Sequence, residues 1–140
     1  EIRPRDWSSD VCSSDLRWEE MMGFIKCCDA GLSIDADTCA NQRFSLPNKL
    51  FDTIGAGVPV IVSPLPEVSA IIAKYRCGLV LDELTPRAIA GALSLLRDDQ
   101  QLLSDLKGNA LSAAEELSWE KEQIAERDLF IRVIKENSIK

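Results

Sequence analysis

The residues with the clearest chemical potential lie in one short segment, residues 45–52, which reads Ser-Leu-Pro-Asn-Lys-Leu-Phe-Asp. Pro47 is typical of the first turn of a helix, because a residue there needs no N–H and has the φ that proline fixes. The backbone N–H groups at a helix start have no partner within the helix and bind anions well. The segment therefore predicts a phosphate site formed by the N–H groups of Ser45, Leu46 and Asn48.

Asp52 follows this start after about one helical turn. Helical side chains lean back toward the N-terminus, so its carboxylate would point toward the same anion site. A carboxylate beside a diphosphate suits the two hydroxyls of a ribose, which it can accept as hydrogen bonds. The alternative is a surface ion pair between Asp52 and Lys49, and spacing alone favours that alternative.

The elements around this segment must hold it beside a sheet. A helical apolar face ends at Gly57, which fits a left-handed residue just after a helix. Residues 58–62 then form a nearly continuous β-branched run, which is typical of a parallel strand covered on both faces. This order predicts an α/β fold, a Rossmann-like parallel sheet with helices on both faces, in which ligands bind beyond the carboxyl ends of the strands.

Several stretches of the sequence resemble one known family. They are residues 45–63, the Leu-Pro-Glu-Val of residues 65–68, the Cys-Gly-Leu-Val of residues 77–80, Thr85–Pro86, and the Leu-Ser-Trp-Glu of residues 117–120. Together they resemble the donor-binding half of family 4 glycosyltransferases, over about residues 17–134. The resemblance implies the incomplete C-terminal half of a GT-B fold, followed by C-terminal helices. In that family the last helix packs back on the amino-terminal domain.

The resemblance also implies roles for particular residues. It implies that Asp52 binds the ribose of a nucleotide-sugar donor, at a position where the family usually has the longer glutamate. The family's other acidic position falls on Phe44 in this sequence. The resemblance implies no metal and no cofactor, because helix N-termini and basic side chains neutralise the donor diphosphate. Arg43 and Lys49 are the local basic candidates, and ordinary solvated charge is the alternative for each.

A metal site is a competing expectation. Asp35 and Asp37 follow a predicted strand with one residue between them. Such a pair invites the motif of the other large glycosyltransferase fold, in which a cation bridges the donor diphosphate. Two carboxylates in a loop are common, however, and a carboxylate site needs more ligands. We therefore expect no metal here.

Residues 1–16 stand apart from the predicted domain, which spans residues 17–140 and is a partial nucleotide-sugar-binding domain. Residues 6–16 read Asp-Trp-Ser-Ser-Asp-Val-Cys-Ser-Ser-Asp-Leu, the in-frame translation of an oligonucleotide resembling a common sequencing-library adapter. We interpret residues 1–16 as a non-native leader and exclude them from the fold. A natural disordered leader rich in serine and aspartate is the alternative.

Composition narrows the class of protein. The chain has the length of one domain, with 140 residues, and its net charge of −7 without basic clusters argues against nucleic acid as a partner. No apolar run reaches the ~20 residues of a membrane span. The sequence has no histidine and no Cys-x-x-Cys, which argues against zinc and favours a reduced, cytoplasmic location. A peripheral position at the inner membrane face is compatible with this, although no membrane contact is encoded here.

The remaining elements follow from apolar periodicity and from helix start and stop residues. Before the central segment we predict a helix over residues 17–29, a strand over 30–34 and a polar loop to Arg43. After it we predict a helix over 67–75, a strand over 79–81, a helix over 101–117 and a last helix over 119–137. Between residues 81 and 101 we predict a further helix, which is capped by Thr85 and turns Ile89, Ala92, Leu93 and Leu96 inward.

These observations predict the donor-binding part of a glycosyltransferase that moves a sugar from a nucleotide-sugar to an unknown acceptor, in glycan or cell-envelope polysaccharide synthesis. The acceptor domain and the catalytic residues would lie in a missing amino-terminal part, so the fragment is expected to be inactive alone. A receiver-like phosphoacceptor domain is one alternative, because Asp35 and Ser63 at strand ends imitate the phosphorylated aspartate and the hydroxyl of such domains. A receiver also needs a lysine at the end of its last strand, however, and here Leu81 is followed by acidic residues. A non-catalytic GT-B partner subunit is another.

Overall fold

The computed structural model describes residues 16–137. The predicted leader therefore lies outside the described residues, except for Leu16. The elements in chain order are α1 (Trp18–Lys26), β1 (Gly31–Ser33), α2 (Ala40–Arg43), α3 (Asn48–Gly55), β2 (Val60–Val62), α4 (Pro66–Tyr75), β3 (Gly78–Val80), α5 (Pro86–Asp98), α6 (Gln100–Glu116) and α7 (Trp119–Asn137).

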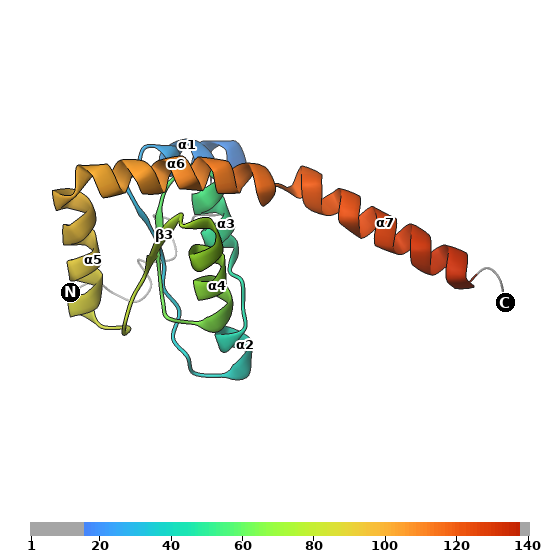
Figure 1. Ribbon diagram of the computed structural model, residues 1–140, viewed down its shortest axis with the longest axis horizontal. Coiled ribbons are helices and arrows are strands. Elements are labelled where there is room, and N and C mark those ends of the chain that lie inside the picture. Colours follow the sequence, from blue (N-terminus) through green and yellow to red (C-terminus); the bar gives the residue numbers. More distant parts are fainter. Residues whose placement is uncertain (1–15, 138–140) are drawn as a thin grey trace.

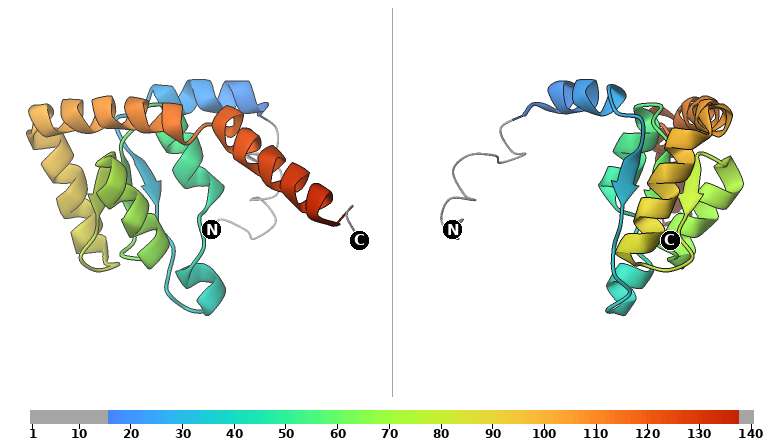
Figure 2. Two further views of the ribbon diagram at one scale, coloured as in Figure 1. Left: turned by 45° about the vertical axis from the view of Figure 1, so that its right-hand side comes forward. Right: turned by 90° about the vertical axis from the view of Figure 1, so that its left-hand side faces the viewer.

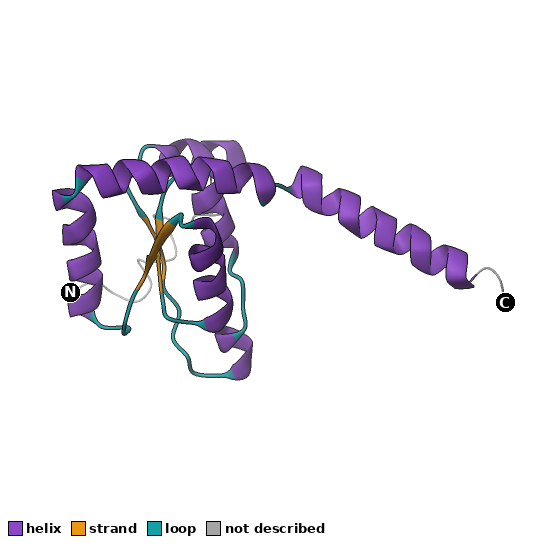
Figure 3. Ribbon diagram, viewed as in Figure 1, coloured by secondary structure: helices purple, strands orange, loops and turns teal. Residues whose placement is uncertain are grey.

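The three strands form one parallel sheet in the order β1-β2-β3, in which Ile61 pairs with Leu32 on one side and with Leu79 on the other. Helices cover both faces of this sheet (Figure 3). The predicted α/β class, with parallel strands, helices on both faces and C-terminal helices, is confirmed. The arrangement fits part of a GT-B fold.

All three strands point toward the same end of the molecule, the lower end in Figure 1. That end also carries α2 and the N-termini of α3, α4 and α5, whereas α6 crosses the opposite end. A parallel strand followed by a helix always brings the helix N-terminus to the carboxyl end of the sheet. The topology thus gathers the predicted site residues at one end.

The core on one face lies under α3 and α4. Val60 and Val62 of β2 pack there with Leu50 and Ile54 of α3, and all four side chains are at most 1% exposed. Helix α3 lies close to β1, because Gly31 has no side chain and any Cβ there would clash with Thr53. This close approach fixes the start of α3 beside the carboxyl end of β1.

The core on the other face lies under α5 and α6, where Ile61 packs with Leu96 and Leu103. Here the prediction for Leu93 is wrong, since this side chain is 43% exposed. Leu93 lies on the side of α5 toward β1, and Leu32 of β1 is itself 46% exposed, so nothing in residues 16–137 covers that strip.

Two local predictions need correction, and one is confirmed. The predicted polar loop up to Arg43 contains the one-turn helix α2, which carries no apolar periodicity that could have revealed it. Pro47 is the N-cap of α3, one position before the predicted first turn. Gly57 has φ 73° and follows α3 in the left-handed conformation, as predicted.

The last helix extends away from the rest of the fold, as Figures 1 and 2 show from two directions. Its apolar side chains Ile124, Leu129, Phe130 and Ile131 are between 43% and 59% exposed. Across the part of the chain that the structure describes, no helix combines the length and the apolar character needed to cross a membrane.

Candidate functional site at the carboxyl end of the sheet

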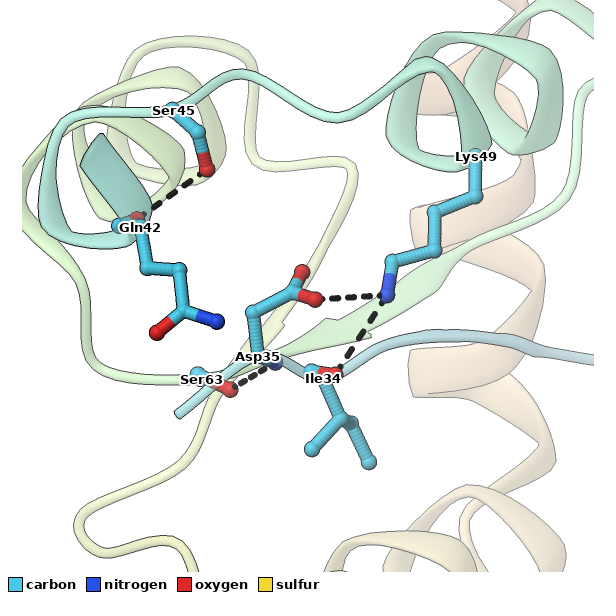
Figure 4. Close-up of polar contacts among 6 residues, drawn as sticks. All are labelled: Ile34, Asp35, Gln42, Ser45, Lys49 and Ser63. Carbon is cyan, nitrogen blue, oxygen red and sulfur yellow. Dashed lines mark hydrogen bonds and ion pairs between the residues drawn. The ribbon is translucent and has the colours of Figure 1, made fainter. Parts of the chain in front are cut away.

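The centre of the site is an ion pair between Lys49 and Asp35. The Lys49 Nζ atom lies 3.0 Å from Asp35 Oδ1 and also donates a hydrogen bond of 3.3 Å to the carbonyl of Ile34 (Figure 4). Lys49 belongs to the first turn of α3, and its side chain leans back toward the helix start, as helical side chains do. The Lys49 ammonium therefore pairs with Asp35, just after the end of β1. The surface ion pair with Asp52, which the spacing favours, is not formed.

Asp35 is held in place by its backbone. Its N–H donates a 2.8 Å hydrogen bond to the Ser63 hydroxyl, and Ser63 is 1% exposed directly after β2. The Ser63 N–H in turn donates to the Ser33 carbonyl at 3.4 Å. Because the ends of β1 and β2 bind each other in this way, the carboxylate of Asp35 projects from a fixed position.

A second pair of opposite charges lies nearby. Arg43, at the end of α2, forms a 3.8 Å ion pair with Asp37. Both residues line an open hollow of about 500 Å³, together with Thr38, Cys39, Ala40, Phe44 and Pro66. The two carboxylates of the Asp35-Ala36-Asp37 segment are thus each bound to one of the two predicted basic residues. Among residues 16–137 no group of three acidic, cysteine or histidine side chains is arranged to hold a metal.

The N–H groups at the start of α3 are free in the described structure. The first one bonded to a carbonyl is that of Leu50, which donates to the Pro47 carbonyl at 3.0 Å. Within residues 16–137, no protein group accepts from the N–H groups of Leu46, Asn48 or Lys49, and all three residues are exposed. The start of α3 therefore offers three unbonded N–H donors at the positive end of the helix, two in its first turn and that of Leu46 in the loop before it.

Ser45, in contrast, uses both of its donors inside the loop. Its N–H and its hydroxyl both donate to the Gln42 carbonyl, at 3.3 and 3.0 Å. The Lys49 N–H, which the sequence did not single out, stands beside those of Leu46 and Asn48 as a free donor.

Asp52 lies one turn behind these donors and is half-buried. Its carboxylate forms no hydrogen bond or ion pair with any residue of the described chain, so it is available to a ligand. Phe44, at the family's other acidic position, is 59% exposed and forms part of the wall of the hollow beside Arg43.

One polar residue was missed by the sequence reasoning. Ser33 is 1% exposed, and its hydroxyl is the buried side-chain oxygen that finds no partner within residues 16–137. It shares the face of β1 that Gly31 presents to Thr53, about 6.6 Å further along the strand. The signal in the sequence that could have identified Ser33 is a small polar residue near the end of a predicted strand.

Comparison with known proteins identifies relatives of one activity. The chain is 26% identical over 110 residues to the chitobiosyldiphosphodolichol beta-mannosyltransferase of Candida albicans, covering 76% of this chain and 24% of that protein. The proteins of the same name from Eremothecium gossypii and Kluyveromyces lactis are 27% and 25% identical, over 79% and 83% of this chain. No family model matches the sequence.

The chain spans about a quarter of the length of the curated relatives that it matches, between 22% and 26%. These relatives are glycosyltransferases, and the similarity is that of a glycosyltransferase fragment.

Proposed function

We propose that this chain is the donor-binding part of a glycosyltransferase, a partial domain that holds a nucleotide-sugar while its sugar moves to an acceptor. The observation that carries the proposal is the start of α3, where N–H groups are free and the Lys49 side chain leans back to Asp35, with the unpaired Asp52 one turn further along the helix. The names of the curated relatives support the same reaction class.

The chemical task is to stabilise the nucleoside diphosphate as its bond to the sugar breaks. Negative charge develops on the diphosphate oxygens, and fixed N–H dipoles aimed at them need no reorganisation during the reaction. In the proposed complex, the N–H groups of Leu46, Asn48 and Lys49 hold this charge. In this proposal the Lys49 ammonium and Arg43 add positive charge, and Ser45 shapes the loop before α3. The chemistry of this donor set requires neither a metal nor a cofactor.

Asp52 accepts the ribose hydroxyls in the same complex. It is half-buried and unpaired, so binding a ribose would remove no existing contact of its carboxylate.

The name of the relatives refers to mannosyl transfer, which makes a hexose the proposed sugar. It also names chitobiosyldiphosphodolichol, so we propose glycan assembly as the process. We propose a cytoplasmic location from the cysteine usage of the sequence, with a peripheral position at the inner membrane face as a compatible variant. The acceptor domain and the catalytic residues belong to the remaining three quarters of a protein of the relatives' length, and the fragment is therefore inactive alone.

The test is titration of the intact protein that contains this chain with UDP-, GDP- and ADP-sugars. Asp52→Ala should weaken the preferred donor by about tenfold or more, because charged hydrogen bonds contribute about 1.5–3 kcal/mol. Asp52→Glu, which restores the family's usual residue, should keep the affinity. Asp105→Ala, an exposed aspartate on α6, is the matched control. Equal affinities for Asp52→Ala and the unchanged protein would remove Asp52 from the site.

A receiver-like phosphoacceptor domain remains a second candidate, because Asp35 lies 3.0 Å from a lysine and beside Ser63. That lysine comes from α3, however, whereas a receiver needs one after the last strand. Incubation with acetyl phosphate separates the two proposals, since a receiver gains about 80 Da on Asp35 and a donor-binding domain gains nothing. A non-catalytic partner subunit would bind no donor in the titration above.

A further inference from the structure

The outer edge of β3 is open. Within residues 16–137, β2 is the strand that pairs with β3, and no strand lies on the other side, so that β3 is the frontmost strand in Figure 1. We infer that this edge, together with the adjacent side of α5, is the interface of a dimer in which a second copy of this chain lies antiparallel along β3. The inference does not depend on the proposed function, because the interface runs along the side of the sheet and the candidate site lies at its carboxyl end.

The backbone of β3 offers hydrogen-bonding groups at this edge. The Leu81 N–H donates to the Val62 carbonyl of β2 at 3.0 Å, and the two strands are parallel. Alternate residues of a parallel strand bind the same neighbour, so the N–H and carbonyl groups of Gly78 and Val80 point outward. An unpaired strand edge of this kind is a template for pairing with another chain.

The side of α5 next to the edge leaves room for a second chain. An open hollow of about 270 Å³ lies between β3 and α5, and its α5 side consists of Ala88, Gly91, Ala92 and Leu95, which form one stripe of the helix. A Cβ at Gly91 would have no atom within 4 Å, and Leu95 is 47% exposed. Val80 of the strand itself is 39% exposed, so the edge is uncovered along its length.

Opposite charges lie at the two ends of β3. Arg76 comes before the strand, Asp82 and Glu83 follow it, and all three are exposed. Among the described residues, neither the Arg76 guanidinium nor the Asp82 carboxylate forms an ion pair or a hydrogen bond. The chain between them is extended and spans about 20 Å, so the two groups cannot pair within one copy.

A second copy satisfies both the backbone and the charges if the two-fold axis passes through Leu79. In that antiparallel register Gly78 lies opposite Val80 of the second copy, and each such pair exchanges both backbone hydrogen bonds. Gly78 has no side chain, which leaves space for the valine opposite it. The same register brings Arg76 beside Asp82 of the second copy, on both sides of the axis. The edge is thus complementary to itself, as a two-fold interface requires.

The test is sedimentation velocity of the chain over rising concentration at low salt. Every protein also carries Leu32→Lys, so that the open strip beside β1 does not contribute to association. This parent chain should form a dimer as its concentration rises. Arg76→Asp and Asp82→Arg should each weaken the dimer by about tenfold or more, because each turns two symmetric attractions into repulsions. Aspartate tolerates the left-handed backbone of residue 76, which has φ 51°.

A mixture of these two variants gives the sharpest result. One variant has aspartate at both positions and the other has arginine at both, so an equimolar mixture should form a heterodimer with about the affinity of the parent. Combining Arg76→Asp with Asp82→Arg in one chain should restore the homodimer. Both results require an interface in which residue 76 meets residue 82 of the second copy.

Val80→Pro tests the pairing of the backbone. It removes an N–H that β2 does not use, and edge strands tolerate proline for that reason. The variant should be monomeric, with the circular dichroism spectrum of the parent. Asp105→Arg, at an exposed aspartate of α6, is the matched control for charge, and its dimer affinity should stay within about twofold of the parent.

Three outcomes would refute this interface. A parent chain that stays monomeric excludes a second copy as the occupant of the β3 edge. A dimer that Arg76→Asp and Asp82→Arg leave unchanged, or a mixture of the two that fails to associate, would place the contact on another surface. The charge variants decide the question even if Val80→Pro fails to fold.

Discussion

The two faces of the sheet are built from the same strands but are closed to different degrees. Under α3 and α4, the residues of β2 and both helices form one buried cluster that also contains Cys77 and two alanines of α6. Under α5, the cluster covers β2 and β3 but leaves Leu32 of β1 46% exposed. The closed face is also the one that positions the start of α3, so the candidate site stands on the better packed half.

The difference follows from the number of helices available to each face. Helix α6 contributes to the clusters on both faces, but two strand-to-strand crossovers, α3 and α4, return over one face and only α5 is added over the other. The outer edge of β1 has no partner strand within residues 16–137. The uncovered strip beside it is where we expect further elements to pack in a protein of the relatives' length, because an exposed strand edge and an exposed leucine both favour association.

The largest expected effect is on the closed face. Leu50→Ala should lower the free energy of unfolding by about 2–5 kcal/mol, because Leu50 is fully buried and its neighbours on α3, β2 and α4 leave little room to collapse. Cys77 lies in the same cluster, and burial raises the pKa of its thiol. Its alkylation near pH 8, followed by peptide mass mapping, should be slow in the unchanged chain and clearly faster in Leu50→Ala.

A smaller effect is expected at the helix that covers the open face. The Thr85 hydroxyl accepts a 3.2 Å hydrogen bond from the Ala88 N–H and so caps α5. Thr85→Ala should cost about 1 kcal/mol in urea denaturation. Thr85→Ser keeps the hydroxyl and is the control; equal losses in the two variants would show that the cap is not the cause.

The smallest effect is expected at the strip that α5 leaves open. Leu32→Lys should change the free energy of unfolding of this chain by less than about 0.5 kcal/mol, because the side chain is already half in solvent. It should also reduce self-association, measured by sedimentation velocity. A loss of stability like that of Leu50→Ala would mean that the two faces are equally closed, and that the comparison is wrong.

Much of the fold was predictable because its signals are local. The Val60–Val62 run, the left-handed Gly57 and the Thr85 cap each depend on residues within a few positions of one another. Helix α2 was not predictable, since a single turn without an apolar face leaves no periodic pattern. The exposure of Leu93 was not predictable either, because it depends on which part of the sheet α5 covers.

The candidate site was predictable in part. The sequence located the start of α3 and showed that Asp52 lies about one helical turn after it. Both follow from helix geometry. Spacing favoured Asp52 as the partner of Lys49, whereas the actual partner, Asp35, lies 14 positions earlier. The sequence also contained no indication of the Ser63 hydroxyl that fixes Asp35 from 28 positions away. The unpaired Ser33 hydroxyl also depends on contacts between elements.

The sequence by itself therefore determined the helix starts, the strands and the residue types at the site, because hydrogen bonding and apolar burial impose short repeats on a chain. Only the tertiary structure decided which charges meet. Along the chain Asp35 and Asp37 had no identified partners, and they became partners of Lys49 and Arg43 when parallel strands brought β1, α2 and α3 to the same end of the sheet.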